Sequence, residues 1–465
     1  MKAPLRSSAA LATVAAALLA GCVAGPDFNA PEAPQVSSYT GADPQRWPRQ
    51  ALVQTMLHPR WWADFGVPAL NDMVDEALRH HPSLASARAA VEEAHAATVS
   101  ARAAVQPRLS IGLVAARGND LDRSTHVSSE RSIGPNLAWS PDINGAVARR
   151  VERAQALEDE GRAKESAAAL ALVTEVTVRA IDLAAAAERR EAMSGILAID
   201  ETLAEMARQA RRAGRVAYVE VLVAEESVEV DRAELASSEL AYATARQALA
   251  LLTGRLPGEW LPPPVRLDAF ALPRDLPLSL PSDLVRRRPD LLAAQARLHA
   301  ASASIGIASS DLYPNVTLDS GWTIAASPAA AVGGGQGVWS LAATLLAPVF
   351  DGQDRQARKQ AAVTAFAGQL AAYRGAVLDA FGDVASAMQA LERDATAAPA
   401  REAAWAAASR FEQGQCLGHR WGRTPLADCL VAQRDLQRAR TARGDALARR
   451  LVDSARWFAA MGAPV

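Results

Sequence analysis

Several residue groups in this 465-residue chain have the types and spacing of reactive sites, and one is a cysteine flanked by glycines. Gly414-Gln415-Cys416-Leu417-Gly418 has the spacing of a nucleophile elbow, with Cys416 in the place of serine and His419 beside it. Such an elbow needs a sharp turn from a strand into a helix within an α/β sheet. The surrounding sequence predicts no such turn, so we predict that the protein is not an enzyme.

Two further patterns have the residue types of a metal site and of a phosphate site. His80-His81 offers two imidazoles, but adjacent helical residues point to different faces. No neighbouring cluster of Cys, Asp or Glu completes a ligand set. Gly333-Gly334-Gly335 lacks the following helix that a phosphate-binding loop requires. We therefore expect a helix end before Pro82, a surface loop at the glycines, and neither metal nor cofactor.

The N-terminal residues indicate the compartment. A basic start, with Lys2 and Arg6, precedes an apolar run over residues 9–20, which is too short to span a bilayer, since that needs about 20 apolar residues. The run ends in Leu19-Ala20-Gly21-Cys22, which resembles the lipobox of bacterial lipoproteins. The resemblance implies a signal peptide over 1–21 and an acylated Cys22; the alternative is a chance cysteine in an ordinary signal. Val23 is not the Asp that resembles an inner-membrane retention signal, so we expect anchoring in outer-membrane lipid.

Composition excludes one class of partner and restricts the cysteines. With 49 basic and 51 acidic residues the chain has a formal charge of −2, which creates no field for a polyanion, so nucleic acid is not expected as a partner. Ala-rich tracts with only 5% aromatic residues are typical of long, closely packed helices. Once Cys22 is acylated, only Cys416 and Cys429 remain, and an oxidising periplasm permits them to pair.

The chain contains an internal tandem duplication. Pro82 and Pro107 recur 207 positions later as Pro289 and Pro314, and the same offset relates Pro141 to Pro348 and Gly145 to Gly352. Proline and glycine matches in one register over so long a stretch are hard to obtain by chance. We therefore predict a linker over 22–64 after the lipid anchor, a first repeat over 65–255, a Pro-rich connector over 256–281 and a second repeat over 282–465.

Each repeat contains a predicted β-hairpin, at 107–141 and 314–348. Apolar residues alternate there with small or polar ones over strands of about ten residues, a pattern typical of transmembrane β-strands. A soluble, half-buried hairpin is the other reading, but lipoprotein targeting and the repetition favour the membrane. Four strands cannot close a barrel, and open sheet edges do not occur in lipid. The barrel is therefore expected to be completed by other subunits.

Helices are predicted on both sides of each hairpin. The segment from Ala69 to Ala104 has a helical composition, and a long helical hairpin follows each pair of strands. In the first repeat, apolar residues at heptad spacing predict coiled-coil packing of the two helices. Its turn is expected at Gly214-Arg215, within a tip at 214–222, and Gly422 has the matching place in a second tip at 422–430.

These residues resemble the TolC-like outer-membrane factors, in particular the NodT-type lipoproteins. The resemblance implies a homotrimer whose subunits give four strands each to a twelve-stranded barrel, continued by a long α-helical barrel of coiled-coil hairpins. It also implies a periplasmic adaptor protein and an inner-membrane pump of the resistance-nodulation-division type. The matching motifs are Gly25-Pro26-Asp27-Phe28, Trp61-Trp62 with Phe65, Leu280-Pro281-Ser282-Asp283-Leu284, Arg287-Arg288-Pro289-Asp290, Pro348-Val349-Phe350-Asp351-Gly352 and Gly214 to Leu222.

The tips depart from the family pattern and carry the remaining candidate residues. Val223 and Val431 stand where the family often has Asp. Glu220 and Asp428 correspond between the repeats, so six such carboxylates would surround the opening of a trimer and attract cations. The alternative is that each only stabilises the start of its helix, by about 0.3–1 kcal/mol. Arg434 is a candidate for ion pairs between neighbouring hairpins.

The two remaining cysteines form a possible disulfide. Cys416 and Cys429 lie at equal distances on either side of a turn centred between Gly422 and Arg423, so they are expected to face each other across the second hairpin. A disulfide requires Cα atoms about 4.4–6.8 Å apart, closer than typical helix axes, so both residues would have to point inward at the seam. Two unpaired, half-buried thiols are the alternative.

The function that we predict is the exit duct of a tripartite efflux system, which passively exports drugs or other small molecules across the outer membrane. One alternative within the same class is the duct of a type I protein-secretion system. An alternative from another class is a structural coiled-coil lipoprotein of the periplasm, which would contain no membrane strands.

Overall fold

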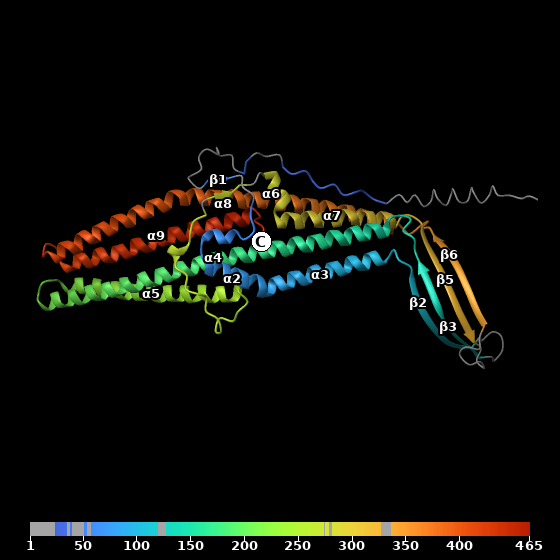
Figure 1. Cartoon of the computed structure of the whole chain (residues 1–465), viewed down its shortest axis with the longest axis horizontal. Coiled ribbons are helices and arrows are strands. Elements are labelled where there is room, and N and C mark those ends of the chain that lie inside the picture. Colours follow the sequence, from blue (N-terminus) through green and yellow to red (C-terminus); the bar gives the residue numbers. More distant parts are fainter. Residues whose placement is uncertain are drawn as a thin grey trace, which may run out of the picture. The chain divides into compact units, whose positions relative to one another are not determined.

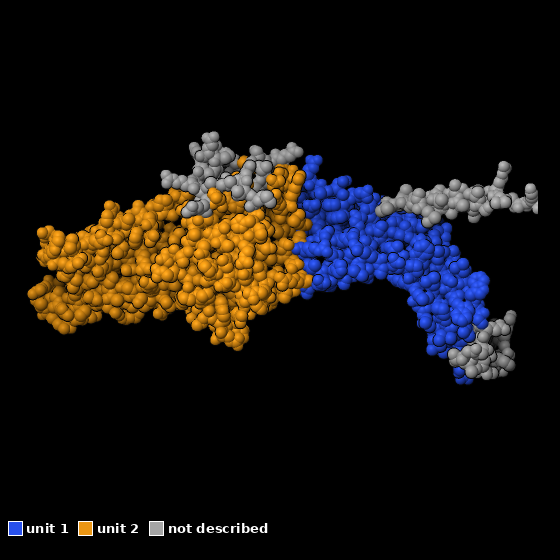
Figure 2. Space-filling model, viewed as in Figure 1, with its two compact units in different colours: residues 1–32, 89–162, 293–375 blue, residues 33–88, 163–292, 376–465 orange. Residues whose placement is uncertain are grey.

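The computed structural model describes residues 24–34, 38–39, 51–53, 57–119, 127–273, 275–278, 281–326 and 336–465. The predicted acylation site Cys22 and the loop Gly333-Gly334-Gly335 lie outside the described residues. The chain divides into two compact units, coloured in Figure 2. Unit 1 comprises residues 1–32, 89–162 and 293–375, and unit 2 comprises 33–88, 163–292 and 376–465. Each unit therefore combines segments from both halves of the sequence.

Unit 1 contains an antiparallel sheet of four strands (Figure 1). The strands are β2 (Arg108–Asn119), β3 (Val127–Trp139), β5 (Asn315–Ala326) and β6 (Gln336–Leu346), in that spatial order. The hairpins β2–β3 and β5–β6 come from different repeats and are joined through β3 and β5, where Ile133 pairs with Ile324. The outer strands β2 and β6 have no strand beyond them within the described chain.

The register of the sheet separates its residues into two faces. Leu109, Leu137, Ser320 and Leu341 lie in one row across all four strands, and Leu113, Ile133 and Ile324 in another. The other face carries small or polar residues, as in the row formed by Ser110, Asn136, Gly321 and Ser340. Successive strand residues point to opposite faces, so the alternation in the sequence produces this separation directly. The apolar face is exposed, above all at the side chains of Leu109, Ile111, Leu113, Trp339, Leu341 and Leu345.

Three helices of the first repeat have partners of equal length in the second. α3 (Pro82–Ala103) and α7 (Pro289–Ser310) each have 22 residues, α4 (Ala146–Arg212) and α8 (Asp354–Arg420) have 67, and α5 (Tyr218–Leu252) and α9 (Leu426–Ala460) have 35. In Figure 1, α4 runs beside α5 and α8 beside α9 as two helical hairpins. Among the described residues, no helix combines the length and apolar character needed to cross a bilayer.

The structure places the one-residue difference between the repeats at the start of α8. Gly145 and Gly352, which are 207 positions apart, both have positive φ angles just before these long helices. Gln353 then adds a second residue with positive φ, at 74°, before α8 begins at Asp354. From this point to the hairpin ends the two repeats are related by 208 positions.

The expected helix end before Pro82 is confirmed. The segment from Ala69 to Ala104 is not a single helix but two, α2 (Pro68–His80) and α3, which begins at Pro82. His81 between them is extended, with φ −69° and ψ 127°. The residue before a proline is sterically disfavoured in the helical region, which explains the break. The second repeat has the same arrangement, with α6 (Pro281–Arg287) ending before Pro289.

The core of unit 2 is built around aromatic residues of the short helix before α2 and of the C-terminal end of α9. Trp61 of the short helix η2 (Trp61–Phe65) stacks on Phe458 of α9, with ring centroids 5.0 Å apart. Trp457 donates its indole N–H to the carbonyl of Pro277, in the small parallel sheet of β1 (Ala51–Val53) and β4 (Asp275–Pro277). Full burial of one such ring stabilises the fold by about 1.5–3 kcal/mol. The connector, with its 3-10 helix η3 (Leu267–Ala269), thereby anchors the base of both hairpins.

Candidate functional site at the ends of the helical hairpins

The two hairpin turns of unit 2 have the same backbone structure. Gly214 and Gly422 have φ angles of +71° and +68°, a left-handed conformation that favours glycine. After Gly214, the N–H of Arg215 donates to the carbonyl of Ala210, at 2.9 Å. After Gly422, Arg423 donates in the same way to Gly418, at 2.8 Å. These bonds satisfy carbonyls at the helix C-terminus and reverse the chain in a few residues.

The candidate acids Glu220 and Asp428 lie in the first turn of α5 and of α9. Both side chains are exposed, and neither helix has a side-chain cap at its N-terminus. A carboxylate in this position interacts favourably with the helix dipole. The two acids form no ion pair or hydrogen bond with each other in the described chain, so one subunit presents them as separate charges.

Arg434 joins the two hairpins of one chain. Its Nη1 lies 3.1 Å from Oδ1 of Asp200, so α9 is linked to α4. Asp200 is only 2% exposed, and removing the guanidinium would leave a buried carboxylate without its cation. The sequence alone suggested that Arg434 pairs between hairpins, but it did not identify Asp200.

A second buried acid completes this cluster. Asp231 on α5 is 6% exposed, and its pKa is raised to about 6. Burial is the main cause, followed by the hydrogen bond with Asp200 and the charge of that neighbour, while Arg438 and Arg434 lower the pKa. Asp231 therefore takes up a proton in mildly acidic solution. Sequence reasoning missed both acids, although Asp231 stands three residues after Val228 of the heptad stripe, where a charge is unusual.

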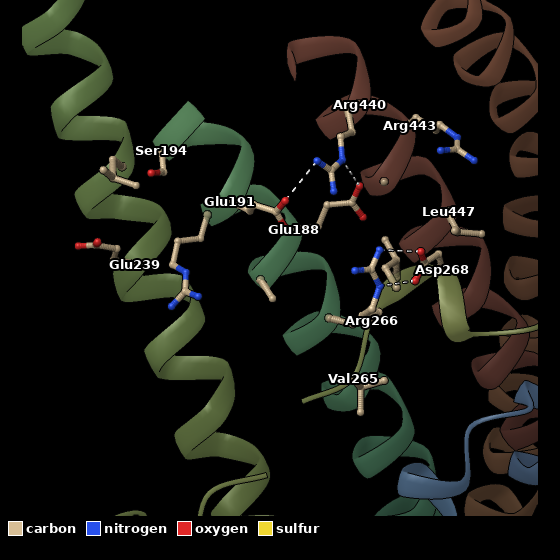
Figure 3. Close-up of a pocket in the computed structure, with 16 residues that line it drawn as sticks. Glu188, Glu191, Ser194, Glu239, Val265, Arg266, Asp268, Arg440, Arg443 and Leu447 are labelled. Atoms are coloured by element: carbon tan, nitrogen blue, oxygen red, sulfur yellow. Dashed lines mark hydrogen bonds and ion pairs between the residues drawn. The ribbon is translucent and has the colours of Figure 1, made fainter. Parts of the chain in front are cut away.

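Further ion pairs follow the seam between α4 and α9. Nε of Arg440 lies 3.1 Å from Glu188, and Arg189 lies 2.6 Å from Asp445. Next to these pairs a cavity of about 550 Å³ opens between α4, α5, α9 and the connector (Figure 3). Part of its charged lining is paired, for instance Arg266 with Asp268 at 2.9 Å and Arg440 with Glu188 at 3.1 Å. The ion pairs along the seam link α4 to α9.

The structure joins Cys416 and Cys429 in a disulfide between α8 and α9. Their Cα atoms are 4.6 Å apart, and the closed loop contains the second turn. Gly414 to Gly418 lie inside the continuous helix α8, so the strand-to-helix turn of a nucleophile elbow is absent there. A bonded sulfur has no free thiolate, which removes the chemical basis of a nucleophile.

The histidine pair has local partners. Nδ1 of His81 lies 2.6 Å from the Ser83 hydroxyl, and Nδ1 of His80 lies 3.2 Å from the Glu76 carbonyl oxygen. The part of the chain that the structure describes contains no group of three or more metal-ligating side chains.

The comparison with protein families assigns the chain. The model of the family described as outer membrane efflux protein matches residues 73–255 and 280–463, which together form most of the chain and follow its two repeats. The chain belongs to the outer membrane efflux protein family. The predicted family, and with it a channel function instead of an enzymatic one, is confirmed.

Individual outer membrane efflux proteins resemble the chain over nearly its whole length. Nodulation protein T of Rhizobium leguminosarum bv. trifolii is 26% identical over 430 residues, covering 90% of this chain and 89% of that protein. Outer membrane protein OprJ of Pseudomonas aeruginosa is 32% identical over 424 residues, covering 87% of this chain and 86% of OprJ.

A solved structure of an outer membrane channel has the same fold. The MtrE channel of Neisseria gonorrhoeae in its open state superposes with a TM-score of 0.82 and 26% identity, over 95% of this chain and 98% of that one. The predicted fold class is thereby confirmed for the single chain. The outer membrane is the location of this efflux protein.

Proposed function

We propose that three copies of this outer membrane efflux protein form the exit duct of a tripartite efflux system. The observation that carries the proposal is the sheet of unit 1, which has two open edges and one exposed apolar face. Open edges leave backbone hydrogen-bonding groups unsatisfied in lipid. Pairing β6 of each copy with β2 of the next removes every edge and produces twelve strands, with the apolar face toward the lipid.

The same arrangement accounts for transport. The face with Ser110, Asn136, Gly321 and Ser340 would line a water-filled lumen, and the helical hairpins of the three chains would continue that lumen into the periplasm. A periplasmic adaptor would bind the hairpins and couple them to an inner-membrane pump of the resistance-nodulation-division type. Drugs or other small molecules are the cargo that we propose. The alternative of a structural coiled-coil lipoprotein does not account for a sheet with an exposed apolar face.

Acylation of Cys22 would hold each subunit in the inner leaflet of the outer membrane. Several acyl chains make stable anchoring possible, whereas one chain binds a membrane only marginally. Incorporation of labelled palmitate into the wild-type protein but not into a Cys22→Ser variant would support this part of the proposal. A wild-type protein without label would contradict it.

The hairpin ends would act as a gate for this duct. Glu220 and Asp428 of three chains would supply six carboxylates around the periplasmic opening, while the Asp200–Arg434 pair would hold the two hairpins of each chain together. The disulfide would stiffen the second hairpin and leave movement between hairpins free. Such movement widens an opening without unfolding its helices.

Two neighbouring substitutions test the duct. Leu341→Arg places a charge on the apolar face, and Ala342→Arg places the same charge on the other face of β6; both positions are exposed in the single chain. An arginine facing lipid costs about 2–4 kcal/mol near the bilayer centre. We expect Leu341→Arg to abolish membrane-assembled trimers, and Ala342→Arg to assemble but lower cation conductance in planar bilayers. Equal behaviour of the two variants would contradict the proposed orientation of the sheet.

A further inference from the structure

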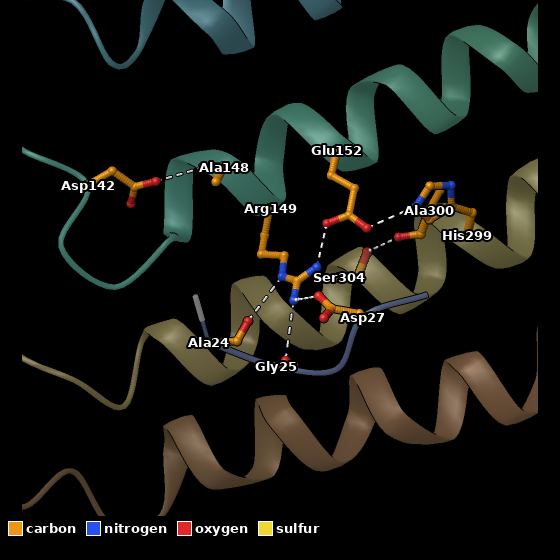
Figure 4. Close-up of polar contacts among 10 residues, drawn as sticks. All are labelled: Ala24, Gly25, Asp27, Asp142, Ala148, Arg149, Glu152, His299, Ala300 and Ser304. Atoms are coloured by element: carbon orange, nitrogen blue, oxygen red, sulfur yellow. Dashed lines mark hydrogen bonds and ion pairs between the residues drawn. The ribbon is translucent and has the colours of Figure 1, made fainter. Parts of the chain in front are cut away.

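The residues from Ala24 onward, which follow the predicted acylation site, bind to a site on unit 1 (Figure 4). We call this site the receiving site; it consists of Asn144, Arg149, His299 and Gly306. We refer to Ala24–Phe28 as the N-terminal strap. Ala24 is buried, and its N–H donates to the carbonyl of Asn144 at 3.1 Å. Arg149 of α4 then donates through Nε to the Ala24 carbonyl at 3.1 Å, and through Nη2 to the Gly25 carbonyl at 3.3 Å. The site therefore holds the backbone of the strap directly.

Arg149 is positioned for this task by a network of its own. Its side chain is only 5% exposed, and Nη1 lies 2.6 Å from Glu152, three residues further along α4. Nη2 also pairs with Asp27 of the strap at 2.8 Å. A buried guanidinium must have its donors satisfied, because its desolvation is otherwise costly. Two of the three strap groups that Arg149 contacts are backbone carbonyls. Binding of the strap by Arg149 therefore depends mainly on the position of its backbone and less on its side chains.

A second contact holds the end of the strap. The ring of Phe28 stacks on His299 of α7, with centroids 4.4 Å apart and planes at 14°. Nε2 of His299 is 2.9 Å from Glu152, the same carboxylate that holds Arg149. One glutamate thus orients both groups that receive the strap.

Two glycines make the close approach possible. Gly25 has a φ angle of +92°, and a side chain there would overlap Gly306 of α7. A Cβ on Gly306 would in turn lie 2.7 Å from Cγ of Arg149. The strap and α7 therefore both have glycine at the point where they touch, as expected for a site that fits this strap.

The receiving site lies at the ends of the membrane strands. Asn144 belongs to the connection between β3 and α4, and its amide donates to the Pro314 carbonyl at 2.5 Å, immediately before β5. Two residues of extended chain span at most about 7 Å. Cys22 precedes Ala24 by two residues, so acyl chains attached to it would start within about 7 Å of Ala24, whose N–H donates to Asn144 in the connection between β3 and α4.

We propose that Arg149 is a positioning residue for the lipid anchor: it fixes the strap so that the acyl chains and the strands of the sheet enter the membrane at one level. The anchor then delivers the sheet to the bilayer in the orientation needed for insertion. This inference rests on the proposed acylation of Cys22. It adds to the lipid anchor a second role, in which the anchor guides assembly of the sheet as well as holding the subunit at the membrane.

A double-mutant experiment separates guidance from ordinary stabilisation. Gly25→Ala displaces the strap, and it is made in the wild-type chain and in Cys22→Ser; Gly368→Ala is the matched control, because a Cβ there meets nothing within 4 Å. The readout is the fraction of full-length protein recovered as membrane trimer, with palmitate labelling in parallel. We expect Gly25→Ala to lower that fraction about threefold or more in the acylated protein and to have no further effect in Cys22→Ser.

Each outcome has a defined meaning. Equal, additive losses in the two backgrounds, with normal palmitate labelling, would overturn the guiding role and leave the lipid anchor intact. Absence of label on the wild-type protein would overturn the anchor and the guiding role together. If Gly25→Ala does not accumulate, Arg149→Lys replaces it in the same cycle, since it keeps the charge and removes the guanidinium donors to the Ala24 and Gly25 carbonyls.

Discussion

The two helical hairpins have the same backbone and different interiors. Their helices are equal in length and their turns are closed by the same hydrogen bonds. The first hairpin buries the carboxyl pair of Asp200 and Asp231, whereas the equivalent positions of the second are Ala408 and Ala439. The second hairpin instead contains the disulfide, at positions where the first has Arg208 and Val221. Duplication preserved the framework, and substitutions placed a buried acid pair near the end of the first hairpin and a disulfide near the end of the second.

A second carboxyl pair reverses this pattern further from the turn. Asp394 of α8 lies near Asp453 of α9, and burial followed by the charge of Asp453 raises the pKa of Asp394 to about 6. The equivalent positions of the first hairpin are Ala186 and Ala245. Each hairpin therefore has one acid pair opposite a pair of alanines in the other. Alanine pairs let helices approach closely without a desolvation cost, whereas buried acid pairs carry that cost. Each acid pair therefore lowers the local stability of its hairpin, at a different distance from the turn in each hairpin.

The largest expected difference between the hairpins comes from Arg434. Its equivalent in the first hairpin is the exposed Glu226. Arg434→Ala leaves Asp200 buried without its cation, so we expect a loss of about 3 kcal/mol of local stability and easier opening of the duct. Glu226→Ala should change stability by less than about 0.5 kcal/mol. Hydrogen exchange of the α9 amides measures the effect of Arg434→Ala, and exchange of the α5 amides measures that of Glu226→Ala. Asp200→Asn combined with Arg434→Ala should restore much of the protection in α9. Equal effects of the two single variants would contradict the role of the pair.

The disulfide provides the next comparison. Reduction, or Cys416→Ser together with Cys429→Ser, should lower the stability of the second hairpin end by about 3 kcal/mol, the value expected for short closed loops. Hydrogen exchange should increase near residues 416–429 and stay unchanged near 208–221. Arg208→Cys with Val221→Cys should introduce the same bond into the first hairpin. If peptide mapping of protein matured in the periplasm finds two freely alkylated cysteines at 416 and 429, the bond is absent.

The carboxyl pair of the first hairpin makes its stability depend on pH. The pKa of Asp231 is about 6 in the folded chain and 3.8 in the unfolded one, so between these values the folded state holds a proton that the unfolded state has released. Stability should therefore fall as the pH rises from about 4 to about 6 and remain lower above it, by on the order of 1–3 kcal/mol. Asp231→Asn should remove this dependence and stabilise α5 at pH 7. Hydrogen exchange of the α5 amides at pH 5 and 7 tests this prediction. Ala439→Asn is the matched change in the second hairpin. An unchanged pH dependence of stability in Asp231→Asn would contradict the assignment of that dependence to Asp231.

The smallest effect on stability is expected at the exposed acids of the two tips. Glu220→Ala and Asp428→Ala should each cost about 0.3–1 kcal/mol through the helix dipole. Together they should shift the reversal potential in a salt gradient toward zero and weaken block by multivalent cations. Glu234→Ala, which removes an exposed acid from the body of α5, is the control. Unchanged reversal potentials would assign both acids to helix stabilisation alone.

The sequence by itself determined the repeating framework. Alternation with period two marks the strands, prolines and glycines mark the boundaries, and Gly214 and Gly422 mark the turns because a left-handed backbone favours glycine. These are local preferences, so neighbouring residues suffice to predict them. The helix end before Pro82 is predicted in the same way, because a residue that precedes a proline is disfavoured in the helical region.

Only the tertiary structure decided which side chains meet. The partner of Arg434 lies 234 positions away, and the strap at Ala24 reaches Arg149 across 125 positions. Neither pairing follows from local spacing, because each depends on how segments far apart in the sequence pack against each other. The pKa of Asp231 has the same origin: burial and a neighbouring carboxyl raise it, and both exist only once α4 and α5 are in contact. Framework and turns are short-range properties of the chain, whereas charge pairing and burial are properties of the packed molecule.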